Sequence, residues 1–136
     1  MKNFLKKLSH VSFFTSKLKE TIEFYCKLIG CRVVHEFKNK NGDVYGVFLY
    51  ANNGTFIEFF YKETVSREKS NFDHICFEVE DIEKIGEKFE TNGYAVQIKR
   101  GKTDNVLQFF VDDPNNIKIE FHQHDKQSKF YKLLAK

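Results

Sequence analysis

The stretch Ser9-His10-Val11-Ser12-Phe13 returns later in the chain as Asp73-His74-Ile75-Cys76-Phe77, and this repeat decides the fold. A second pair accompanies it, because Ile57-Glu58-Phe59 returns as Ile119-Glu120-Phe121. From position 10 to 74 is 64 residues and from 58 to 120 is 62, with Gly30 and Gly93 at the intermediate offset of 63. Self-similarity at a fixed period outranks local propensity as a fold signal. We therefore interpret the chain as a duplicated unit of roughly sixty residues.

The first unit has the pattern of a β-α-β-β-β module. Alternation predicts a strand over about 8–14, with His10, Ser12 and Phe14 on one face. Helical spacing then predicts a helix from an N-cap at Ser16 to about residue 28, ended by Gly30. Strands over about 32–38, 43–51 and 55–61 complete the module.

The second unit repeats this order. We expect a strand over about 72–79, a helix over 82–92 ended by Gly93, and strands over about 95–100, 105–112 and 116–122. Asp113-Pro114-Asn115-Asn116 is typical of a turn before the last strand. The sequence thus predicts an α+β fold of two tandem βαβββ modules in one domain of 136 residues. Module one covers about 8–61, a polar linker 62–71, module two 72–122 and a tail 123–136; the tail should form a short surface helix whose apolar stripe is Phe130, Leu133 and Leu134.

Composition excludes several classes of function. The net charge of +3 is too small, and the lysines too dispersed, to predict nucleic-acid binding. No apolar run is long enough for a membrane helix, and the N-terminus lacks the pattern of a signal peptide. Cys26, Cys31 and Cys76 are odd in number and lack Cys-x-x-Cys spacing, which favours reduced thiols in the cytoplasm.

The duplicated His and Glu are candidate metal ligands. In each module the His lies in the first strand and the Glu in the last, so both side chains share a face if those strands are neighbours. His10, Glu58, His74 and Glu120 then offer two imidazoles and two carboxylates to one divalent ion. Either His alone is better explained as structural. His122 shares the strand face of Glu120 and is expected in a supporting or surface role, whereas Cys76 is expected to pack or line a cavity.

The paired modules, the His in each first strand, the Ile-Glu-Phe in each last strand and the turn over 113–117 resemble the vicinal oxygen chelate superfamily. Within it the chain is most similar to small bacterial glyoxalase I, lactoylglutathione lyase. That family's ligand order, His or Gln, Glu, His, Glu, is matched by His10, Glu58, His74 and Glu120. The resemblance implies a curved sheet with a metal cleft and one divalent ion per site, Ni, Zn, Co, Mn or Fe. It also implies a homodimer whose chains share their sites.

The implied activity is that of a metal-dependent lyase or isomerase that enolises a chelated α-hydroxycarbonyl. Glu120 or Glu58 would act as the catalytic base, and the sequence does not distinguish them. The implied partner is a small-molecule substrate, such as a thiol adduct, with no nucleic acid and no membrane.

Substrate recognition departs from the family pattern. Bacterial glyoxalase I holds glutathione with an Arg four residues after the first His and an Asn four after the first Glu; this chain has Phe14 and Lys62 there. Glutathione specificity is therefore open, and Phe14 favours a more apolar or aromatic ligand. Lys102 matches a basic loop position that the family uses for substrate, and Lys62, Arg100 and Lys102 are candidates for holding an anionic group.

Two alternatives stay open. The first is an acyl-thioester epimerase or another metalloenzyme of the superfamily. The second is a metal-free drug-binding protein of the bleomycin-resistance type, which would be expected to lack the ligands found here.

Overall fold

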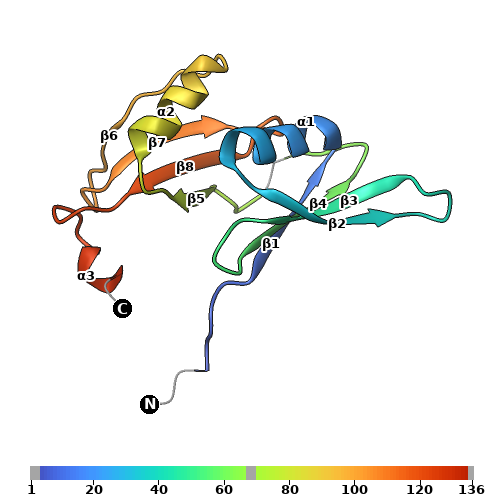
Figure 1. The fold of residues 1–136 in the computed structure, drawn as a ribbon, viewed down its shortest axis with the longest axis horizontal. Coiled ribbons are helices and arrows are strands. Elements are labelled where there is room, and N and C mark those ends of the chain that lie inside the picture. The colour runs from blue at the N-terminus through green and yellow to red at the C-terminus, as the bar shows by residue number, and fades with distance from the viewer. Residues whose placement is uncertain (1–3, 67–69, 135–136) are drawn as a thin grey trace. The chain divides into compact units, whose positions relative to one another are not determined.

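Each half of the chain builds a four-stranded sheet in which the first and last strands of the module lie side by side (Figure 1). The computed structural model describes residues 4–66 and 70–134. The chain divides into two compact units, Met1–Glu68 and Lys69–Lys136, called module one and module two below. Their boundary falls in the predicted linker 62–71, of which residues 67–69 lie outside the described residues.

Module one contains β1 (His10–Thr15), α1 (Leu18–Glu23), a π-helical continuation (Phe24–Ile29), β2 (Arg32–Lys38), β3 (Val44–Tyr50) and β4 (Phe56–Tyr61). Its strand order is β1-β4-β3-β2, with β1 parallel to β4 and the other pairs antiparallel. Its core joins Tyr25 of the helix to the inward residues of β3 and β4, all of them fully or almost fully buried: Val47, Leu49, Ile57 and Phe59.

The start of α1 differs from the prediction that Ser16 is its N-cap. Lys17 occupies that position and caps with no side-chain hydrogen bond, and Ser16 is exposed. The buried hydroxyl of Thr15 instead accepts from the Lys17 backbone N–H at 2.9 Å and lies 3.1 Å from the Thr21 hydroxyl. The first turn of the helix is therefore held by the buried hydroxyls of Thr15 and Thr21. Each has a hydrogen-bond partner, as buried polar groups in folded proteins usually do. Gly30 ends it as predicted, at φ +98°, where a residue without Cβ is unstrained.

Module two contains β5 (His74–Glu78), α2 (Ile82–Thr91), β6 (Lys99–Arg100), β7 (Leu107–Asp112), β8 (Lys118–Gln123) and α3 (Tyr131–Leu134). The order β5-β8-β7-β6 repeats that of module one, with β5 parallel to β8. Helix α2 packs on β7 and β8 (Figure 1), and Phe89, Phe109, Ile119 and Phe121 are fully or almost fully buried between them. The predicted α+β fold of two βαβββ modules is confirmed.

Two segments of module two are shorter than predicted. The strand expected over 95–100 pairs only at Lys99 and Arg100. Val96 and Ile98 instead lie over Gly86 of α2, where an added Cβ would come within 3.3 Å of each side chain, so they pack on the helix. The tail helix covers only Tyr131–Leu134, with Phe130 and Leu133 exposed; the Leu134 side chain and residues 135–136 lie outside the described residues. In the described ranges, no helix combines the length and apolarity needed to cross a bilayer.

Candidate metal site

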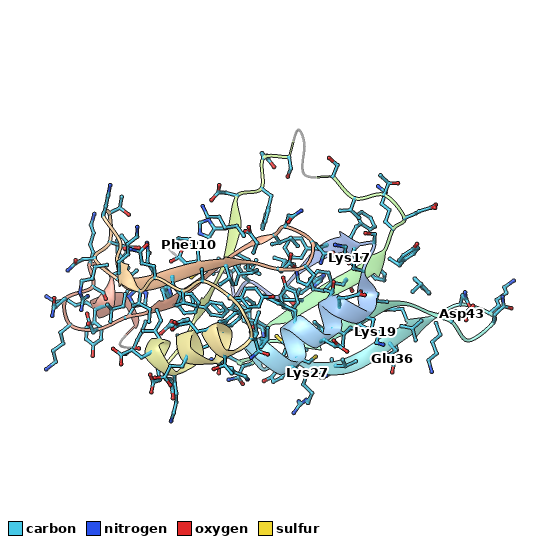
Figure 2. All side chains as sticks on the ribbon, turned by 90° about the horizontal axis from the view of Figure 1, so that it is seen from above. Lys17, Lys19, Lys27, Glu36, Asp43 and Phe110 are labelled. Carbon is cyan, nitrogen blue, oxygen red and sulfur yellow. The ribbon has the colours of Figure 1, made fainter. Side chains whose placement is uncertain are left out.

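Module two has a polar sheet face on the side away from α2. In the β5–β8 pairing His74 lies opposite Lys118, Cys76 opposite Glu120, and Glu78 opposite His122. On the other side of β8, Phe110 of β7 lies opposite Glu120, and Figure 2 shows Phe110 on the sheet side remote from α2. Because alternate residues of a strand share a face, this register gathers the polar side chains of two strands on one surface.

His74 and Glu120 are in contact on this face. Nε2 of His74 lies 3.1 Å from Oε1 of Glu120, and Nδ1 lies 2.6 Å from Oδ2 of Asp73. Glu120 is only 8% exposed, although it lies on the polar face, because its neighbours on β5, β7 and β8 cover it. An imidazole held at one nitrogen by a carboxylate presents its other nitrogen in a fixed direction, as in the second shell of many metal sites.

The second oxygen of Glu120 faces a different pair of donors. Oε2 lies 3.6 Å from Nδ1 of His122, and a ligand atom from each of Cys76, Glu120 and His122 falls within 4.8 Å of the others. Burial and then the negative charge of Glu120 raise the pKa of the Cys76 thiol, so it stays protonated without a cation. Burial and the neighbouring His124 lower the pKa of His122. Its imidazole is therefore neutral at pH 7, the form that binds a metal.

Module one repeats half of this arrangement. His10 lies opposite Phe56 and Ser12 opposite Glu58, so His10 and Glu58 have the same register relation as His74 and Glu120. The ring of His10 meets Phe48 edge-on at 5.8 Å, as that of His74 meets Phe110 at 6.0 Å. Among the described residues, however, His10 and Glu58 form no ion pair, and Glu58 is half-buried. The structure therefore brings together one predicted pair of ligands and aligns the other pair on one face.

Two of the four predicted substrate residues also lie together. Nζ of Lys62 lies 4.8 Å above the ring centre of Phe14, and Phe14 is 53% exposed on the face that carries His10. A cation over an aromatic face is a weakly attractive pair that still leaves the ammonium able to meet an anion.

The other two predicted substrate residues lie elsewhere in module two. Arg100 makes a two-pronged ion pair with Asp125, at 2.6 and 3.1 Å, so its charge is already matched. Its place opposite Leu107 puts it on the α2 side of the sheet. Lys102 is exposed in the turn that follows β6.

The sequence reasoning missed Lys118 and the ligand chemistry of Cys76. Cys76 is exposed as a residue on the polar face, although the side chains around it partly withdraw its sulfur from water. Lys118 lies directly opposite His74, with Nζ 4.9 Å above the ring centre of Phe110. Lys118 and Phe110 also line a hollow of about 490 Å³ in module two. The signal was present, because a parallel pairing of the first and last strands sets 74 against 118 and 76 against 120.

Comparisons with known proteins agree with this architecture. The family model described as Glyoxalase/Bleomycin resistance protein/Dioxygenase superfamily matches residues 7–121. A glyoxalase family protein from Enterococcus faecalis is 22% identical with a TM-score of 0.73, over 88% of this chain and 99% of that one. A putative glyoxalase family protein from Bacillus anthracis is 20% identical with a TM-score of 0.73, over 92% and 100%.

A genomically encoded fosfomycin resistance protein from Listeria monocytogenes is 15% identical with a TM-score of 0.71, over 93% and 99% of the two chains. Identities this low show a shared fold and not a shared substrate. The family model covers most of the chain and includes all four duplicated His and Glu residues. The chain belongs to the glyoxalase/bleomycin resistance protein/dioxygenase superfamily.

Proposed function

We propose that this protein is a metal-dependent lyase or isomerase of the glyoxalase I type, acting on an α-hydroxycarbonyl compound. The observation that carries the proposal is the contact of 3.1 Å between Nε2 of His74 and Oε1 of Glu120, on a face whose register is repeated by His10 and Glu58. These four residues are proposed as the ligands of one divalent ion, two from each module.

The donors present fit such an ion. Both nitrogens of His74 face carboxylate oxygens, which only accept hydrogen bonds, so each contact requires either an N–H or a cation between the two atoms. A divalent cation at Nε2 satisfies the imidazole and the buried Glu120 together. Two imidazoles and two carboxylates form a neutral complex suited to Ni, Zn, Co, Mn or Fe. When bound, such an ion would supply Lewis-acid polarisation of the substrate carbonyl.

The chain's own residues carry out the proton transfer. In the proposed reaction Glu120 or Glu58 takes the proton from the hydroxyl-bearing carbon next to the carbonyl and returns it to the carbonyl carbon. The hydroxyl proton moves to the former carbonyl oxygen, so the reaction is an isomerisation that consumes nothing else. Asp73 holds Nδ1 of His74 and thereby fixes the direction of Nε2. Burial of Glu120 limits water access, which protects the abstracted proton from exchange with solvent.

For substrate recognition we propose Phe14 and Lys62 first, because they lie together at the end of the face that carries His10 and Glu58. An aromatic surface with a cation above it suits a substrate that has an apolar body and an anionic group. Lys102 is proposed as a second cation, whereas Arg100 would have to leave Asp125 first. We further propose a homodimer in which the two chains share their sites, and a cytoplasmic location.

The test is turnover of hemithioacetals formed from methylglyoxal and a panel of thiols, glutathione included, with Ni or Zn added. Product is followed by NMR in deuterated water, which also reports deuterium entering at the reacting carbon. We expect turnover with at least one adduct and a loss of at least about a hundredfold in Glu58→Gln or Glu120→Gln, since each removes a ligand and a candidate base. Glu36→Gln, at an exposed position of β2, is the matched control and should be unchanged. Absence of turnover with every adduct would refute the glyoxalase type.

A further inference from the structure

Beside the four-residue site, module two carries a second group of metal-binding atoms that the duplication did not produce. It consists of Cys76, Glu120 and His122, whose sulfur, oxygen and nitrogen donors lie within 4.8 Å of one another. Zinc binds sulfur at about 2.3 Å and nitrogen or oxygen at about 2.0–2.2 Å, which puts tetrahedral ligand atoms roughly 3.3–3.8 Å apart. Side-chain rotations that move the donors by about 1 Å therefore suffice to close a site.

The backbone places these donors without strain. The strands β5 and β8 lie side by side (Figure 1) and are parallel. Their register sets Cys76 directly opposite Glu120, and His122 is two residues beyond Glu120 on the same face. The carboxylate of Glu120 serves both groups, because Oε1 faces His74 at 3.1 Å and Oε2 faces His122 at 3.6 Å. Binding through Oε2 does not require the contact with His74 to break.

A fourth donor lies next to the group. The ring of His124 packs against that of His122 at 4.5 Å, and its Nδ1 is buried without a hydrogen-bond partner in the described part of the chain. A buried nitrogen of this kind costs free energy unless something binds it. In the sequence Glu120-Phe121-His122-Gln123-His124, three potential ligands thus alternate along β8 and the residue that follows it.

Module one shows that this group is particular to the second module. The positions equivalent to Cys76 and His122 there are Ser12, opposite Glu58, and Phe60, two residues beyond it. Among the described residues, Cys76, Glu120 and His122 are the group of three such side chains close enough to hold an ion. Module two therefore carries a thiol and an imidazole at positions where module one has neither.

We propose that module two by itself binds a thiophilic divalent ion, such as Zn²⁺ or Co²⁺, through Cys76 Sγ, the Glu120 carboxylate and the His122 imidazole. A thiolate ligand selects such ions over Mg²⁺ or Mn²⁺, which prefer oxygen. The thiol proton leaves as the ion binds, so binding releases one proton. This site goes beyond the proposed function, requires no residue of module one, and shares only Glu120 with the four-residue site.

The experiment is a Co²⁺ titration of the full-length reduced protein followed by absorption, because a cobalt–thiolate bond gives an intense near-ultraviolet charge-transfer band that oxygen and nitrogen ligands do not. We expect the band in the wild type, its loss in Cys76→Ser, and at least about tenfold weaker cobalt binding in His122→Gln. Cys26→Ser, which removes a thiol of module one, should keep the band unchanged. Far-ultraviolet circular dichroism checks that each variant is folded.

The double variant His10→Ala/Glu58→Ala separates this site from the proposed enzyme site. It should keep the cobalt–thiolate band while losing turnover of thiol adducts. A wild type without the band, a band that survives Cys76→Ser, or a band lost in the double variant would each overturn the proposal. None of these results depends on whether the protein is a glyoxalase.

Discussion

Phe121→Ala tests whether the aromatic core of module two holds the strand that carries Glu120 and His122. Phe121 is 0% exposed, and its ring lies 5.0 Å from that of Phe109, 5.2 Å from Phe89 and 5.8 Å from Phe77. Buried Phe→Ala substitutions cost about 3–5 kcal/mol. Each lost aromatic pair accounts for about 0.5–1.5 kcal/mol beyond area. With three rigid ring neighbours unable to collapse into the space, we expect about 4–5 kcal/mol.

Native-state hydrogen exchange resolved by mass spectrometry measures this loss in peptides that cover β7 and β8. The free energy of opening of these amides should fall by the predicted amount. Phe110→Ala is the matched control, because Phe110 lies on the opposite face of β7 and is only half-buried. It should cost about 1 kcal/mol, close to the usual value for substitutions outside the core. A loss below about 2 kcal/mol for Phe121→Ala, or equal losses for the two variants, would refute the assignment of faces.

Three further changes probe the local structure. Asp125→Asn should reduce the acid sensitivity of the segment after β8. The Arg100 hydrogen bonds hold the pKa of Asp125 below its usual value, so their stabilising contribution is present at neutral pH and is lost as the pH falls through that lowered pKa. Hydrogen exchange in residues 123–130 between pH 6 and 2.5 measures this loss. Asp81→Ala should destabilise α2 by about 1 kcal/mol in urea unfolding, since the Asp81 carboxylate caps the Lys84 N–H at 3.1 Å; Glu80→Ala, exposed one residue earlier, is its control. Gly46→Ala should destabilise module one by about 1–3 kcal/mol in the same assay, because the added Cβ would meet the Phe60 ring at 2.5 Å and the Phe59 carbonyl oxygen at 3.0 Å; a neutral result would mean that the β3–β4 pairing is looser than described.

The sequence predicted the architecture because the duplication and the alternation pattern act over whole modules. The strand Arg32–Lys38 follows from such a pattern. The adjacency of the first and last strands entered the sequence-based prediction only as a condition, and the structure shows it in both modules. The residues at which helices begin were less predictable. Ser16 has the chemistry of an N-cap, but the tertiary position of Thr15, buried against Thr21, decides which hydroxyl is used.

The site was predictable in part for the same reason. Strand alternation places His74 and Glu120 on one face, and their contact follows once β5 and β8 are parallel neighbours. Which residues lie opposite Cys76 and Lys118 depends on the register of that pairing. A change of one residue in this register would give every side chain of β5 a different neighbour on β8. The ion pair of Arg100 could not be predicted from the sequence. Its partner Asp125 lies 25 positions away in an irregular segment that no periodic pattern describes.

The most direct test of the four-residue site is equilibrium dialysis against Mn²⁺, which prefers oxygen ligands to thiolates and so avoids the thiolate group. The wild type should bind one Mn²⁺ per site, and His10→Ala, Glu58→Ala, His74→Ala and Glu120→Ala should each lower the affinity at least about tenfold. Glu36→Ala should bind as the wild type does. Wild-type affinity in Glu58→Ala together with loss in Glu120→Ala would contradict the claim that both modules supply ligands to one ion.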